Sequence, residues 1–332
     1  MIHFIWVFLR RSKQRAQQKC TNDNKRTTNI RNSPAHILTM SNFLNLAYNQ
    51  WSRKANIDID HNSAFNIFMD KLREKSAFSF VRFGDGELGI LKDGLSWDGK
   101  VPQNYTKEAK KDLESLISLN VKSHQDDLPN KVYIGAQFGD QWIKQRALGE
   151  TAQKLKKEII NVFPASIFSW ATVTDKICSF FEELNEHESP IILVGPKMLR
   201  KQTVLKNVTF VETPKVRCWE SDEDINNRLR SKIKKLKSPI IIYCCSITAK
   251  RLILKNYLDY GDKIYQIDFG ANLNPYSEDF CRLWHYNVCL HHFSETNPDK
   301  LPEIKKRRDQ FLKKEQNRKK RGREQNKKKK DL

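Results

Sequence analysis

Two carboxylates separated by one residue, Asp85 and Glu87, follow an apolar segment and stand beside glycines. In an extended turn, side chains two residues apart point to the same side, so both carboxylates could face one ligand. Gly84 would let the backbone approach that ligand closely. Hard divalent cations such as Mn²⁺ or Mg²⁺ bind one or two carboxylates, and substrate phosphates and water complete the shell. An acidic turn without any ligand is the alternative interpretation of the motif.

Arg82 lies inside the apolar segment 78–83, just before this turn. A guanidinium placed among apolar residues needs an anionic partner, because burying an unpaired charge is strongly unfavourable. A substrate phosphate would serve, and so would a structural ion pair with Asp85. The position of Arg82 therefore indicates an anion nearby without identifying it.

Polar residues and glycines also follow three other apolar segments of the chain. Gly195 and Lys197 follow 191–194, and Ser246 and Thr248 follow 240–245. Asp268 lies at the end of 264–269, and Asn272 lies after it. A lysine at a helix start could bind phosphate together with backbone amides, or it could simply lie in a loop. Ser246 or Thr248 is expected to cap the helix that follows. Asp268 could act as a general base, accept a sugar hydroxyl, or stabilise a turn.

The elements that must position these residues alternate along the chain. Apolar periodicity predicts helices over 64–75, 107–119, 141–162, 222–236 and 246–260, and strands over 78–83, 132–136, 191–194, 208–211, 240–245 and 264–269. Leu252, Ile253 and Leu258 are the expected buried residues of the last helix. Apolar strands separated by helices predict an α/β fold, a Rossmann-like parallel sheet with helices on both faces. In such sheets ligands bind beyond the carboxyl ends of the strands, where we expect the four polar segments to converge.

The basic residues are concentrated at the C-terminus. The chain has 332 residues and a formal net charge of +21, and residues 305–330 alone carry 15 Lys or Arg against 3 acids. We expect a short apolar N-terminus with a disordered linker over 1–39, one catalytic domain over 40–302, and a basic helical or disordered tail over 303–332. The tail suggests contact with an anionic membrane or with nucleic acid, and binding through this tail is the alternative to enzymatic function.

The apolar segment Met1 to Leu9 is too short to span a bilayer, which takes about 20 residues. The cysteine count of 7 is odd and shows no framework spacing, which favours reduced thiols and a cytoplasmic protein, with peripheral membrane attachment still open. Cys281, His285, Cys289 and His292 have a spacing that would suit zinc, but the same segment also suits a packed aromatic helix.

The segment Arg82 to Glu87 reads Arg-Phe-Gly-Asp-Gly-Glu and resembles the signature of GT-D type glycosyltransferases. The later strand ends follow in a comparable order, so the resemblance covers about residues 65–276. It implies a metal motif made by Asp85 and Glu87, a nucleoside-diphosphate sugar donor such as a UDP-sugar, and a glycan or glycoconjugate acceptor. It thus implies a hexosyl- or pentosyltransferase in glycan biosynthesis.

The sequence departs from this family at two places. Ser246-Ile247 stands where many members have Gly-Pro, and Gly270-Ala271 stands where many have Gly-His. No histidine role can therefore be carried over. Asp85, Glu87 and Asp268 are the catalytic candidates, and the substrate-binding candidates are Arg82, Gly84, Gly195, Lys197, Ser246, Thr248 and Asn272.

Overall fold

The structure is a computed structural model and describes residues 59–94, 103–136, 148–174, 176–277, 286 and 298–328. Its chain divides into two compact units. The first comprises Met1–Lys197 and Leu205–Ala271, and the second comprises Met198–Val204 and Asn272–Leu332. The chain passes from one unit to the other at 197/198, within the 3-10 helix η1 (Lys197–Lys201), at 204/205, and at 271/272, within the 3-10 helix η4 (Gly270–Ser277).

The first unit is built on a seven-stranded sheet in the order β3-β2-β1-β7-β6-β4-β5. Every strand pair is parallel. The strands are β1 (Phe78–Phe83), β2 (Lys131–Ala136), β3 (Phe163–Pro164), β4 (Ile191–Pro196), β5 (Thr209–Thr213), β6 (Ile240–Tyr243) and β7 (Tyr265–Asp268). The predicted α/β fold with a parallel sheet is therefore confirmed.

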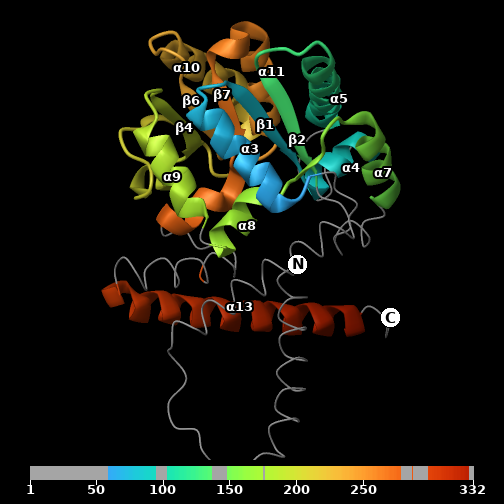
Figure 1. Ribbon diagram of the computed structural model, residues 1–332. Coiled ribbons are helices and arrows are strands. Elements are labelled where there is room, and N and C mark those ends of the chain that lie inside the picture. Colours follow the sequence, from blue (N-terminus) through green and yellow to red (C-terminus); the bar gives the residue numbers. More distant parts are fainter. Residues whose placement is uncertain are drawn as a thin grey trace, which may run out of the picture. The chain divides into compact units, whose positions relative to one another are not determined.

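Helices cover both faces of the sheet (Figure 1). Packed together on one face are α4 (Asp85–Asp93), α5 (Gln103–Gln125), α10 (Asp222–Ile233) and α11 (Thr248–Tyr260), and α7 (Gly149–Glu158) packs against α4. On the other face lie α3 (His61–Arg73), α8 (Ile167–Val173) and α9 (Ile177–Glu186), which pack on one another. Two further 3-10 turns, η2 (Cys218–Ser221) and η3 (Gly261–Lys263), join elements of the first unit.

The two faces of the sheet have different cores. Aliphatic side chains dominate beneath α5, α10 and α11, where Val81, Ile241 and Ile253 are fully buried. Aromatic rings dominate beneath α3 and α8, where the Phe68 ring stacks on Phe78 at a centroid distance of 5.2 Å. Apolar side chains on both sides of each strand explain why the strands show no alternation in the sequence.

Several elements differ from the sequence expectations, and the short helices α4, α8 and α9 were not predicted. Strand β3 was not predicted, because its two residues include a proline and leave no periodic signal. Of the predicted helix over 141–162, the described part is α7, which ends at Glu158. The expectation that Leu258 is buried is wrong, since it is 68% exposed, whereas Leu252 and Ile253 are buried as expected. Leu258 follows the buried Tyr257, and neighbouring residues of a helix point about 100° apart.

The second unit contains η5 (Pro298–Lys300) and the long helix α13 (Leu301–Lys328). A small apolar cluster is formed by Tyr286 and Ile304, with Leu301 and Phe311 packed against it. Among the described residues, no helix combines the length and apolar character needed to cross a membrane. The proposed domain boundaries at 39/40 and 302/303 remain predictions.

Candidate functional site

The four polar segments predicted from the sequence follow four adjacent strands, β1-β7-β6-β4. Because all four strands are parallel, their carboxyl ends share one edge of the sheet. From β4 the chain continues outward to β5, whereas from β6 it continues in the opposite direction to β7. Such a reversal opens a crevice in which α/β proteins bind ligands.

Asp85 and Glu87 occupy the first turn of helix α4, which begins immediately after Gly84. The expectation of an extended turn is therefore wrong. Residues two apart in a helix point about 200° from each other, so the two carboxylates do not extend in parallel as we expected. The helix is favoured here because Glu87 Oε2 accepts the backbone N–H of Gly84 at 2.9 Å. Acidic side chains also interact well with the positive end of the helix dipole.

Arg82 forms its ion pair with Asp268 at the end of β7. Its Nη2 lies 3.4 Å from Asp268 Oδ1, and its backbone N–H donates to Oδ2 at 3.2 Å. The acid in this pair comes from a neighbouring strand, whereas the sequence suggested Asp85. Gly270 packs against the same guanidinium so closely that a Cβ atom there would lie 1.7 Å from Arg82 Nη2.

Lys250 on α11 forms ion pairs with acids of two other elements, α4 and β7. It was not among the site residues predicted from the sequence. Its Nζ lies 2.8 Å from Asp268 Oδ2 and 2.9 Å from Glu87 Oε1. The Lys250 side chain is only 6% exposed, and Asp268 is 1% exposed. The signal was present in the sequence, because Lys250 precedes the buried Ile253 and Leu254 by one helical turn. A lysine on that face must find anionic partners.

The electrostatics of this cluster keep its groups charged. Burial alone would raise the pKa of the Asp268 carboxyl, but Lys250 and Arg82 outweigh burial and hold that pKa below its ordinary value. Burial alone would lower the pKa of the Lys250 ammonium, but Asp268 and Glu87 outweigh burial and raise that pKa. Each charge therefore stabilises its partners at an edge of the sheet where a ligand is expected.

Neither Ser246 nor Thr248 caps helix α11 with its side chain, so that expectation is wrong. The residue before the helix is Ile247, and no side chain caps the helix. Ser246 has a left-handed backbone, with φ of 55°, and its carbonyl accepts the N–H of Ala249 at 3.1 Å. The chain thus turns into the helix through its backbone. Thr248 is the first residue of α11 and is fully buried.

The remaining candidates lie at or after the other strand ends. Gly195 is a buried residue of β4, and Lys197 is an exposed residue at the start of η1. Asn272 lies in η4, belongs to the second unit and is buried. Their proposed contacts with substrate remain predictions.

The carboxylates at the start of α4 fit a divalent cation only in part. Both oxygens of Glu87 have partners, because Oε1 is paired with Lys250 and Oε2 accepts the N–H of Gly84. Asp85 Oδ1 accepts the N–H of Gly86 at 3.0 Å. A carboxylate oxygen has two lone pairs, so an oxygen that accepts one hydrogen bond can also bind a metal. Within the described ranges, no group of three His, Cys, Asp or Glu side chains could hold a metal. A cation here would have to be held by one or two carboxylates, with substrate phosphates completing its shell.

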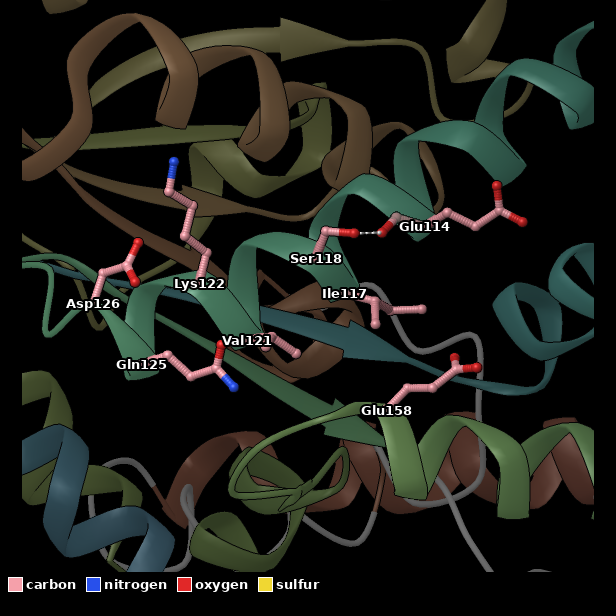
Figure 2. Close-up of a pocket in the computed structure, with 8 residues that line it drawn as sticks. All are labelled: Glu114, Ile117, Ser118, Val121, Lys122, Gln125, Asp126 and Glu158. Atoms are coloured by element: carbon pink, nitrogen blue, oxygen red, sulfur yellow. Dashed lines mark hydrogen bonds between the residues drawn. The ribbon is translucent and has the colours of Figure 1, made fainter.

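A groove of about 530 Å³ lies elsewhere, along helix α5 (Figure 2). Its lining comes from the second half of α5 and from Asp126 just after that helix, with Glu158 from the end of α7. Both of these helix ends lead into the first residues of strands, β2 and β3 respectively. The groove therefore lies toward the amino end of the sheet, away from the charged cluster, and it contains none of the predicted site residues. The four residues considered for zinc lie outside the described part of the chain.

Comparison with known proteins gives matches only among solved structures. No protein-family model matches the chain, and no curated protein matches it either. A glycosyltransferase (domain of unknown function 1792) from Streptococcus sanguinis is 16% identical with a TM-score of 0.46, covering 63% of this chain and 80% of that one.

A second structure of domain of unknown function 1792, with selenomethionine, is 15% identical with a TM-score of 0.47, covering 72% of this chain and 83% of the other. A third, described as having a distinct glycosyltransferase fold, is 17% identical with a TM-score of 0.45, covering 69% and 83%. At these TM-scores the likeness carries no argument about the activity of this chain.

Proposed function

We propose that this chain is a metal-dependent glycosyltransferase that moves a sugar from a nucleoside-diphosphate sugar, expected to be a UDP-sugar, to a glycan or glycoconjugate acceptor. The supporting observation is the charged cluster of Arg82, Glu87, Lys250 and Asp268 at the carboxyl edge of adjacent parallel strands. The resemblance of residues 82–87 to the GT-D signature supports the same reaction. Cations and carboxylates at that edge suit a ligand that carries a diphosphate.

In this proposal Asp85 and Glu87 hold Mn²⁺ or Mg²⁺. When bound, such an ion neutralises negative charge on the leaving nucleotide. Arg82 and Lys197 add positive charge from β1 and η1, and preorganised charge of this kind stabilises a transition state effectively. The backbone turns after β4 and β6 would approach the diphosphate, with Gly195 providing close access.

Asp268 is better suited to hold Arg82 and Lys250 in place than to remove a proton. Both of its oxygens are engaged by these cations, at 3.4 Å and 2.8 Å. Their charges keep its pKa low despite burial, and a carboxylate with a low pKa is a weak general base. We therefore propose that Asp268 positions the two cations.

The decisive experiment replaces the two acids of α4. We expect Asp85→Ala and Glu87→Gln each to reduce Mn²⁺-dependent consumption of UDP-sugar by at least about a hundredfold, because charge stabilisation in the transition state is lost. Glu87→Gln keeps an oxygen that can accept the N–H of Gly84, so the helix start is preserved. Glu114→Ala, which removes an exposed acid from the α5 groove, is the matched control and should keep full activity. Full activity in both α4 variants would overturn the proposal.

We further propose that the basic residues of α13 bring the enzyme to an anionic surface, where its acceptor is found. Residues 313–328 carry nine Lys or Arg against two Glu and contain no apolar residue. Such a segment attracts anionic lipid headgroups by charge alone, and nucleic acid is the competing target.

A further inference from the structure

The ammonium of Lys250 occupies a cation position between two acids of the candidate site. Its three N–H donors have three acceptors: Asp268 Oδ2 at 2.8 Å, Glu87 Oε1 at 2.9 Å, and the Ser246 carbonyl at 3.5 Å. No donor remains for a substrate. Lys250 is therefore a positioning residue that acts through Glu87 and Asp268.

The formal charges of the four groups paired around this ammonium are balanced. Arg82 and Lys250 contribute two positive charges, and Glu87 and Asp268 contribute two negative charges. A divalent cation on the α4 acids would bring two more positive charges next to Lys250. A nucleoside diphosphate alone would bring negative charge next to Glu87 and Asp268. The cation and the diphosphate thus relieve each other's unfavourable charge.

We propose that Lys250 weakens the binding of a divalent cation at Asp85 and Glu87, so that the cation binds tightly only together with a nucleoside diphosphate. This inference rests on the proposed function, because it assumes the same cation and the same class of donor. Binding of either ligand then raises the affinity for the other by the same factor, as linkage between two sites requires. Lys250 sets the size of that factor by repelling the cation when it arrives alone.

The test is a titration of the full chain with Mn²⁺, in which free Mn²⁺ is measured by electron paramagnetic resonance with and without UDP, and the Mn²⁺ bound by UDP in protein-free solution is subtracted. For the unmodified protein, we expect UDP to tighten Mn²⁺ binding at least about tenfold. Equal affinity with and without UDP would overturn the inference while leaving the metal site of the proposed function intact. No Mn²⁺ binding in either condition would instead count against the proposed function.

Variants separate the charge of Lys250 from a purely structural role. We expect Lys250→Met to bind Mn²⁺ alone about tenfold more tightly and to reduce the enhancement by UDP, because one repelling charge is removed. Lys250→Arg keeps the charge and should behave like the unmodified protein. Lys92→Met, which removes an exposed lysine near the end of α4, is the matched control and should change neither quantity.

Asp268→Asn provides a second variant with the opposite expectation. It removes one negative charge and leaves Lys250 paired with Glu87, so Mn²⁺ alone should bind about tenfold more weakly. Near-ultraviolet circular dichroism establishes which variants are folded. A folded Lys250→Met protein with unchanged or weaker Mn²⁺ binding would refute the role of Lys250. If Lys250→Met does not fold, the test is Asp268→Asn. Unchanged or tighter Mn²⁺ binding by that variant would then refute the role of Lys250.

Discussion

At the scale of single residues, Gly270 and Arg82 depend on each other. Gly270 has a left-handed backbone with φ of 58°, and it packs directly against the Arg82 guanidinium. A side chain at position 270 would have to displace the arginine that pairs with Asp268. The glycine therefore belongs to the charged cluster although it carries no functional group.

We expect Gly270→Ala to destabilise the protein and to disturb the site. The left-handed backbone costs a non-glycine residue about 1–2 kcal/mol, and the Arg82 guanidinium must also move away from the new Cβ atom. Urea denaturation measures this loss. Gly94→Ala is the matched control, because its backbone is also left-handed, with φ of 64°, and nothing lies within 4 Å of a Cβ atom there. Equal stability of both variants would contradict the packing of Gly270 on Arg82.

His61 is a second residue whose surroundings lead to a testable prediction. It is fully buried at the start of α3, and its Nε2 lies 2.9 Å from Ser166 Oγ. Burial lowers the pKa of His61 to about 3, although the charge of Asp60 opposes that shift. The folded state therefore keeps this imidazole neutral, whereas the unfolded chain takes up a proton near its ordinary pKa of about 6.5.

We expect His61 to make the protein less stable as the pH falls. Between pH 6.5 and pH 3 the unfolded state binds more protons, so the free energy of unfolding decreases with falling pH. From pH 7 to pH 5 the loss is at most about 2 kcal/mol. His61→Gln should lose correspondingly less stability over that range, as measured by urea denaturation at both pH values. The same loss in both proteins would contradict a buried, neutral His61.

At the scale of elements, one arginine joins three helices on the aliphatic face of the sheet. Arg251 of α11 contacts Glu108 at 2.7 Å and Asp112 at 3.4 Å on α5, and Asp222 at 2.9 Å on α10. Burial raises the pKa of the Asp112 carboxyl, although Arg251 opposes that shift. The helix that carries Lys250 is thereby fixed against both of its neighbours.

We expect Arg251→Met to reduce stability by about 1–3 kcal/mol, because three acids are left close together without their shared cation. Arg73→Met is the matched control. Its ion pair with Glu183 has the same short distance of 2.9 Å, but the Arg73 side chain is 57% exposed. Removing an exposed pair typically costs less than about 1 kcal/mol. Equal losses of stability in the two variants would show that the network around Arg251 stabilises the protein no more than an exposed ion pair does.

At the scale of the whole molecule, most of the positive charge of α13 lies outside the part of that helix that packs in an apolar cluster. The apolar residues of α13 that pack in the second unit lie in its first part, at Leu301, Ile304 and Phe311. Residues 313–328 are helical and contain no apolar residue. Removing the chain after Leu312 therefore keeps the apolar cluster while it removes most of the tail charge.

We expect a chain that ends at Leu312 to consume UDP-sugar at the rate of the full chain and to lose at least about tenfold in binding to vesicles with anionic lipid. Vesicles of neutral lipid and a DNA duplex are the comparison surfaces. Loss of sugar-nucleotide consumption would favour a binding function for the tail, and stronger binding to DNA than to vesicles would contradict the lipid target.

The sequence by itself determined six of the seven strands, their alternation with helices, the parallel α/β sheet and the four strand ends that share one edge. Each of these follows from local patterns, because a run of apolar residues between helices has few other stable arrangements. The positions of Asp85, Glu87 and Asp268 at that edge were predictable for the same reason.

Only the tertiary structure decided how these groups are paired. Arg82 and Asp268 are 186 residues apart, and they meet because β7 is inserted between β1 and β6. The role of Lys250 depends on the same insertion and on the position of α11 over β1 and β7. The helical start of α4 depends on Glu87 reaching back to Gly84 while Lys250 holds its other oxygen. Such contacts arise from strand order and packing, which local residue patterns do not specify.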